Sequence, residues 1–161
     1  MLLSNLANTA INIFVFYAAP ILDMSSQIVL PDLHARALYL YSHLWFLNAI
    51  YGLYTAQTVY SLIPFGVGCT SLLYWGKPRY DWRRTADMSM CIFSSVYVTY
   101  SLIGSPQWNT YLFIKALGYL AYFSGWYYHA QKQYTLSTIL HMGTHLSAHT
   151  GTIMLFNYAR Q

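Results

Sequence analysis

The chain has 161 residues, of which 57% are hydrophobic and only 7% are charged, whereas roughly a quarter of the residues in a soluble domain are charged. Its acidic residues are four aspartates, too few to cover a soluble globule with charge. The composition therefore excludes an ordinary soluble domain, two free-standing cysteines exclude a disulfide scaffold, and a net charge of +4 is too small to suggest a nucleic-acid partner.

Apolar segments of about 20 residues, the length that crosses a hydrocarbon core about 30 Å thick, follow one another along the chain. The first, 5–22, is short and either spans a membrane or lies at its surface. Five stronger candidates come after it: 35–54, 57–76, 86–104, 108–128 and 134–158. We predict an all-α fold, a polytopic membrane bundle of five to six transmembrane helices that forms a single domain over residues 1–161.

The division between the second and third segments is the least obvious one. Residues 35–76 form an almost charge-free run that is too long for one crossing. We divide it near Thr55. Gly52 and Pro64, with the glycines that follow Pro64, offer places where the chain can turn or kink.

Four basic residues lie in the connection between the third and fourth segments: Lys77, Arg79, Arg83 and Arg84. If all six segments span, this connection lies on the same side as residues 23–36 and Lys132. The positive-inside rule places that side in the cytoplasm, or in the matrix for a mitochondrial inner-membrane protein. Basic residues interleaved with aromatic ones also suit anionic headgroups such as cardiolipin, or an acidic partner subunit.

Lys115 is a charge inside the 108–128 segment, where a central charge costs a few kcal/mol or more. Its position about two turns from the start of the segment allows the ammonium to snorkel towards the interface. The alternative is a buried partner, such as a carboxylate or a lipid phosphate.

The last segment carries three of the six histidines, His141, His145 and His149. Their spacing places them on one helix face. Three interpretations stay open: packing and hydrogen bonding between helices, a metal site, or a haem or quinone contact, in which His43 could supply a second haem ligand. His141 and His149 lie about 12 Å apart at 1.5 Å rise per residue, so at most two of the three share one ion.

A second cluster joins the third and fourth segments. Ser71 lies near the end of one and Asp87 at the start of the next. A helical hairpin would return Asp87 to about the depth of Ser71, so that both face one cavity. An aspartate at that depth needs a partner, for which Arg83 and Arg84 are local candidates.

These positions carry a resemblance to a known superfamily. The chain resembles the seven-helix membrane hydrolases and receptors that include alkaline ceramidases and the progestin and adipoQ receptors. Their pattern is a Ser with a His four positions later, an Asp at the start of the next helix, and a His-x-x-x-His pair in the last helix. Ser71, Asp87, His141 and His145 match it from Thr58 onwards, but Trp75 stands where the first His is expected.

The resemblance implies a zinc site. It assigns His141 and His145 as ligands, Asp87 as the general base or water-positioning group, and Ser71 as an oxyanion or orienting donor. An indole nitrogen cannot bind zinc, so Trp75 leaves this site one ligand short. His149 or His43 would have to supply it.

A site that lacks a ligand retains little catalysis, so the sequence favours a non-catalytic accessory subunit of a larger membrane assembly over an enzyme. Mitochondrial inner-membrane complexes, ATP synthase or the respiratory chain, are the predicted hosts of this small, basic, tyrosine-rich protein. The predicted partners are other membrane subunits and phospholipid such as cardiolipin, with no cofactor and no nucleic acid. The alternative is a zinc-dependent intramembrane hydrolase of a lipid amide.

Overall fold

A computed structural model describes residues 29–160, and the regular structure in this part of the chain is helical. The helices are α2 (Asp32–Ser42), α3 (Leu44–Tyr54), α4 (Thr58–Trp75), α5 (Trp82–Leu102), α6 (Trp108–Ala130) and α7 (Tyr134–Ala159). The predicted all-α class is confirmed. The candidate segment 5–22 lies outside the described residues.

The four later segments of the sequence prediction correspond to α4, α5, α6 and α7. The prediction of one helix over 35–54 is wrong, because the helix is interrupted at His43. The His43 Nδ1 atom lies 3.1 Å from the Tyr39 carbonyl oxygen and 3.3 Å from that of Leu40. A ring nitrogen that bonds to these carbonyls competes with the helical ladder, a recognised cause of helix breaks.

The turn between α3 and α4 lies where the sequence predicted it, although neither Gly52 nor Pro64 makes it. Ala56 adopts a positive φ of 59°, and the Thr55 hydroxyl donates to the Gly52 carbonyl at 3.0 Å. Gly52 serves packing instead, since a Cβ there would lie 2.7 Å from the Phe156 ring. Pro64 is buried inside α4.

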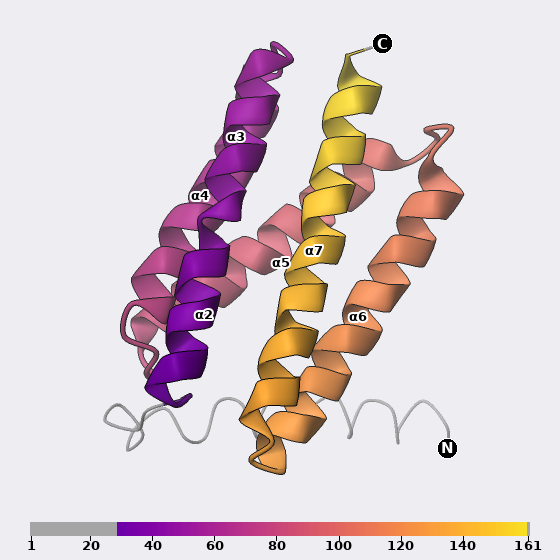
Figure 1. Ribbon diagram of the computed structural model, residues 1–161. Helices are drawn as coiled ribbons and strands as arrows, with labels where there is room; N and C mark the ends of the chain where they lie inside the picture. Colours follow the sequence, from indigo (N-terminus) through magenta and orange to yellow (C-terminus); the bar gives the residue numbers. More distant parts are fainter. Residues whose placement is uncertain (1–28, 161) are drawn as a thin grey trace, which may run out of the picture.

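The helices form two groups that α5 joins (Figure 1). In the first, α2 and α3 follow one another beside α4. In the second, α6 and α7 are antiparallel neighbours and form the most extensive helix pair. Gly118 lets them approach, because a Cβ there would lie 2.8 Å from the Ser147 Cβ.

The basic connection, the start of α2 and the α6–α7 turn gather at one end of the bundle. The Val29 amide donates to the Pro78 carbonyl at 3.1 Å, and the His129 Nε2 atom lies 2.9 Å from the Val29 carbonyl oxygen. The described parts of these connections therefore lie at one end of the bundle. The α3–α4 turn and the C-terminal end of α7 lie at the opposite end (Figure 1).

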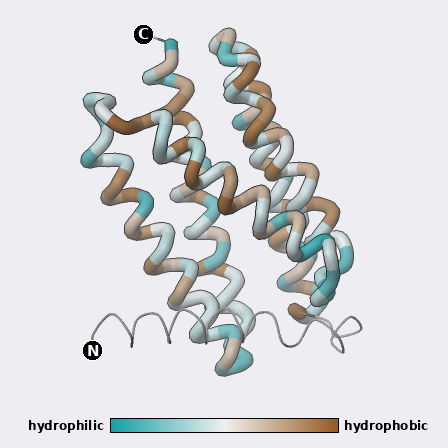
Figure 2. Tube along the Cα trace, turned by 180° about the vertical axis from the view of Figure 1, so that it is seen from behind, coloured by the Kyte–Doolittle hydropathy of each residue, from teal (hydrophilic) through white to brown (hydrophobic). Residues whose placement is uncertain are grey.

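Large apolar side chains are exposed along every helix, for example Leu47 at 60%, Leu62 at 63% and Phe123 at 63%. Figure 2 shows hydrophobic residues spread along the helices and a hydrophilic α4–α5 connection. Within residues 29–160, no helix combines the length and the mean hydropathy of a membrane span.

Helix α5 begins with a side-chain cap. The Asp81 carboxylate accepts a hydrogen bond of 2.9 Å from the Arg83 backbone amide. We expect Asp81→Ala to lower the free energy of unfolding by about 1 kcal/mol, the usual effect of losing an N-cap acceptor. Asp81→Asn keeps an acceptor and is the matched control. Thermal unfolding of the purified protein measures both, and equal losses for the two variants would contradict a capping role.

The cap also predicts a pH dependence. Hydrogen bonds from the Arg83 guanidinium lower the pKa of the Asp81 carboxyl below its ordinary value of 3.8. A lowered folded-state pKa stabilises the fold above pH 3.8, and this contribution is lost as the pH falls from there through the folded-state pKa. Unfolding curves should therefore show a stronger acid loss for the native sequence than for Asp81→Asn.

Candidate functional site

Ser71 of α4 and Asp87 of α5 meet as the sequence predicted. The Ser71 hydroxyl donates to Asp87 Oδ1 at 2.6 Å, and the Thr70 hydroxyl donates to the same oxygen at 3.3 Å. Asp87 is only 7% exposed. The suggestion that Arg83 is its partner is wrong, because that guanidinium pairs with Asp81 at the helix cap.

His141 and His145 also lie together. The Trp45 indole donates to His145 Nδ1 at 3.2 Å, and the two histidine Nε2 atoms are 3.1 Å apart. Because an indole nitrogen only donates, Nδ1 of a neutral His145 is the acceptor and its proton is at Nε2. His145 therefore donates to His141, and the pair forms a directed hydrogen-bond chain from α3 into α7.

Trp75 of α4 lies beside His141. Its ring centroid is 5.3 Å from that of His141, in an edge-to-face arrangement. The Trp75 Nε1 atom is buried and has no hydrogen-bond partner among the described residues. The position where the superfamily pattern has a histidine therefore faces His141 but holds a donor.

The donor set does not fit the zinc site that the resemblance implies. Trp45 holds a proton on the His145 nitrogen that faces His141, and a protonated nitrogen has no lone pair for a metal. Across residues 29–160, no three His, Cys, Asp or Glu side chains gather closely enough to hold a metal ion. His43, the other suggested ligand, is exposed at the α2–α3 break.

His149 is held by α3 in a similar way. The Asn48 amide nitrogen lies 2.9 Å from His149 Nδ1, and the Trp45 ring centroid is 4.0 Å from the His149 ring. Sequence reasoning missed Trp45 and Asn48 as partners of the α7 histidines. Their spacing of three residues, which puts both on one face of a helix, was the available signal.

A cavity of about 420 Å³ connects these groups with the other half of the bundle. Asp87, His141 and His145 line it, and so does Lys115 of α6, whose ammonium reaches the Ser95 carbonyl of α5. Most of its remaining lining is apolar or aromatic side chains of α5, α6 and α7. The arrangement suits an amphipathic molecule better than a polar one.

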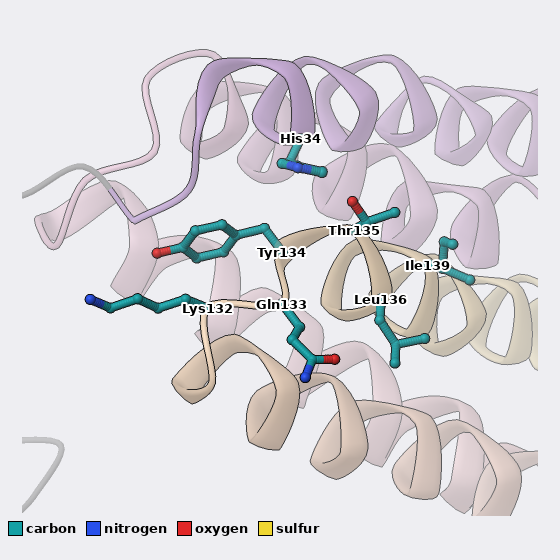
Figure 3. A pocket seen from close by; sticks show the side chains of 7 residues that line it. All are labelled: His34, Lys132, Gln133, Tyr134, Thr135, Leu136 and Ile139. Atoms are coloured by element: carbon teal, nitrogen blue, oxygen red, sulfur yellow. The ribbon is translucent and has the colours of Figure 1, made fainter.

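The basic end carries the predicted lipid-contacting residues. Lys77 and Arg79 are exposed, and Arg83 and Arg84 are half-buried in the first turn of α5. Nearby, an open pocket of about 460 Å³ lies between α2 and the start of α7, lined among others by His34 and Lys132. Figure 3 shows His34 facing the first turn of α7 across this pocket.

The comparisons with known proteins give no relative: no family model, no curated protein and no solved structure matches this chain.

Proposed function

We propose that this protein is a non-catalytic accessory subunit of a larger membrane complex. The host that we propose is a bioenergetic assembly of the mitochondrial inner membrane, ATP synthase or the respiratory chain. In it, the segment made of α2 and α3 and the helices α4, α5, α6 and α7 cross the bilayer. The observation that carries the proposal is the outer face of α6. This helix packs chiefly against α7, and its other side exposes a row of large apolar residues: Phe113, Leu117, Leu120, Phe123, Trp126 and Tyr127.

Exposed apolar surface of this extent marks an interface with protein or lipid. The polar groups inside support a structural role. Asp87 accepts hydrogen bonds from Ser71 and Thr70, His145 accepts one from Trp45, and His141 is bonded to His145. Groups that are satisfied by their own protein stabilise helix packing.

The charge distribution supports the orientation and the lipid contacts. One end of the bundle, where Val29 bonds to the α4–α5 connection and to His129 near the α6–α7 turn, carries five basic residues: Lys77, Arg79, Arg83, Arg84 and Lys132. A basic end of this kind faces the matrix under the positive-inside rule, and its cations suit the phosphates of cardiolipin.

Membrane extraction and native electrophoresis test the proposal together. The tagged protein should stay in the membrane pellet at alkaline pH and, in mild detergent, migrate within a complex much larger than 18.6 kDa. Alanine at Phe113, Leu117 and Leu120 should release it from that complex, whereas alanine at Val59 and Leu62 of α4, equally exposed, should not. Release into the alkaline supernatant, or migration as a lone monomer, would overturn the proposal.

A zinc-dependent hydrolase of a lipid amide is the second candidate. The observation in its favour is that Asp87, His141 and His145 line one apolar cavity. Against it, neither the protonated His145 nitrogen nor the Trp75 indole has a lone pair for zinc. Metal analysis of the purified protein decides, because this candidate needs about one zinc ion per chain.

A further inference from the structure

The strongest unassigned feature is the end of the cavity between α5, α6 and α7 where Lys115 lies. Its ammonium turns towards α5 and donates to the Thr99 hydroxyl and, at 3.4 Å, to the Ser95 carbonyl. The rings of Tyr111 and Tyr119 flank it, each with its centroid 5.6 Å away. The Lys115 ammonium is therefore bonded inside the bundle, to a hydroxyl, a carbonyl and two aromatic rings beside the cavity.

This cation has no carboxylate partner in the part of the chain that the structure describes. The ion pair found there joins Arg83 and Asp81. Asp87 lines the same cavity, but it precedes Ser95 by eight residues of α5, which is about 12 Å at the rise of an α-helix. Two of the three ammonium hydrogens have acceptors, so one is left for a ligand.

Hydroxyl groups complete the surroundings of the ammonium. The Tyr111 side chain is 4% exposed, and its hydroxyl lies 2.7 Å from that of Thr99. The Tyr119 hydroxyl lies 3.4 Å from that of Ser95. The Thr99 hydroxyl donates to the Ser95 carbonyl, so the Tyr111 hydroxyl donates to Thr99. The ammonium and the Tyr119 hydroxyl remain beside the apolar lining, and together they offer an oxyanion a charge and a donor.

We propose that this cavity binds a single-chain amphipathic carboxylate, a long-chain fatty acid, with its carboxylate at Lys115 and its chain along the apolar lining. A volume of about 420 Å³ lies near the lower end of the range for small-molecule sites, which favours one chain over a two-chain phospholipid. One lysine balances the single charge of a carboxylate. The Asp87 carboxyl at the far end sets the direction, because it would repel an anionic head.

The site goes beyond the accessory role, and its test does not depend on partner subunits. Delipidated full-length protein in mild detergent is titrated with palmitate, methyl palmitate and lysophosphatidate, and binding is measured by native mass spectrometry. We expect saturable binding of one palmitate per chain. Lys115→Met should weaken palmitate at least tenfold and leave methyl palmitate unchanged, whereas Lys115→Arg should retain palmitate.

Two further variants separate the site from the fold. Lys77→Met removes an exposed lysine outside the cavity and should bind palmitate like the native sequence. Ala148→Phe places a ring in the lining and should reduce the binding of both palmitate and its ester. Equal palmitate affinity in Lys115→Met and the native protein would overturn the proposal, as would tighter binding of lysophosphatidate than of palmitate, or no saturable binding at all.

Discussion

Phe156→Ala should destabilise the bundle by about 3–5 kcal/mol, the usual cost of removing a buried phenylalanine ring. Phe156 is fully buried and joins the two groups of helices. Its ring lies against Gly52 of α3, where even a methyl group would come within 2.7 Å of it, and its centroid is 6.1 Å from that of Tyr51. Gly52 has no side chain that could fill the space left by the missing Phe156 ring.

Thermal or denaturant unfolding in the purification detergent measures this loss. Phe123→Ala is the matched control, because Phe123 is 63% exposed on α6 and exposed substitutions usually change stability by no more than about 0.5 kcal/mol. Similar losses for the two variants would mean that α7 does not pack on α3 as described.

The helices were predictable because their apolar segments are long and separated by polar connections. The boundaries of α4, α6 and α7 lie within a residue or two of the sequence prediction. The break at His43 was not predictable, since no glycine or proline marks it. It depends on a histidine ring that bonds to carbonyl groups one turn earlier. Such a bond depends on the conformation of the side chain, which the sequence does not show.

One contact of the candidate site was predictable from the sequence, and the others were not. Pairing of Ser71 with Asp87 follows from a hairpin that returns the chain to the same depth, a local consequence of helix lengths. The partners of the histidines come from α3, about 100 residues earlier in the chain. Such contacts depend on how the two groups of helices pack, and nothing in the spacing of His141, His145 and His149 identifies Trp45 or Asn48.

Two tryptophans separate the histidine cluster from a metal site, and replacing both should create one. Trp75→His would add a third imidazole beside His141, at a ring separation of about 5 Å. Trp45→Phe would remove the indole that holds the proton of His145 on the nitrogen facing His141. We expect the double variant to bind about one zinc ion per chain, with three protein ligands and water in the fourth position.

Zinc content after equilibration and gel filtration measures this gain. Either single variant should bind zinc at least tenfold more weakly than the double one, because Trp75→His alone leaves the proton on His145 and Trp45→Phe alone leaves only two imidazoles. Adding His141→Ala to the double variant should abolish the site. Full zinc binding by Trp75→His alone would show that the Trp45 hydrogen bond does not fix the tautomer. If the double variant bound none, the three positions would not converge on one ion, and the resemblance would not extend to the geometry of the zinc centre.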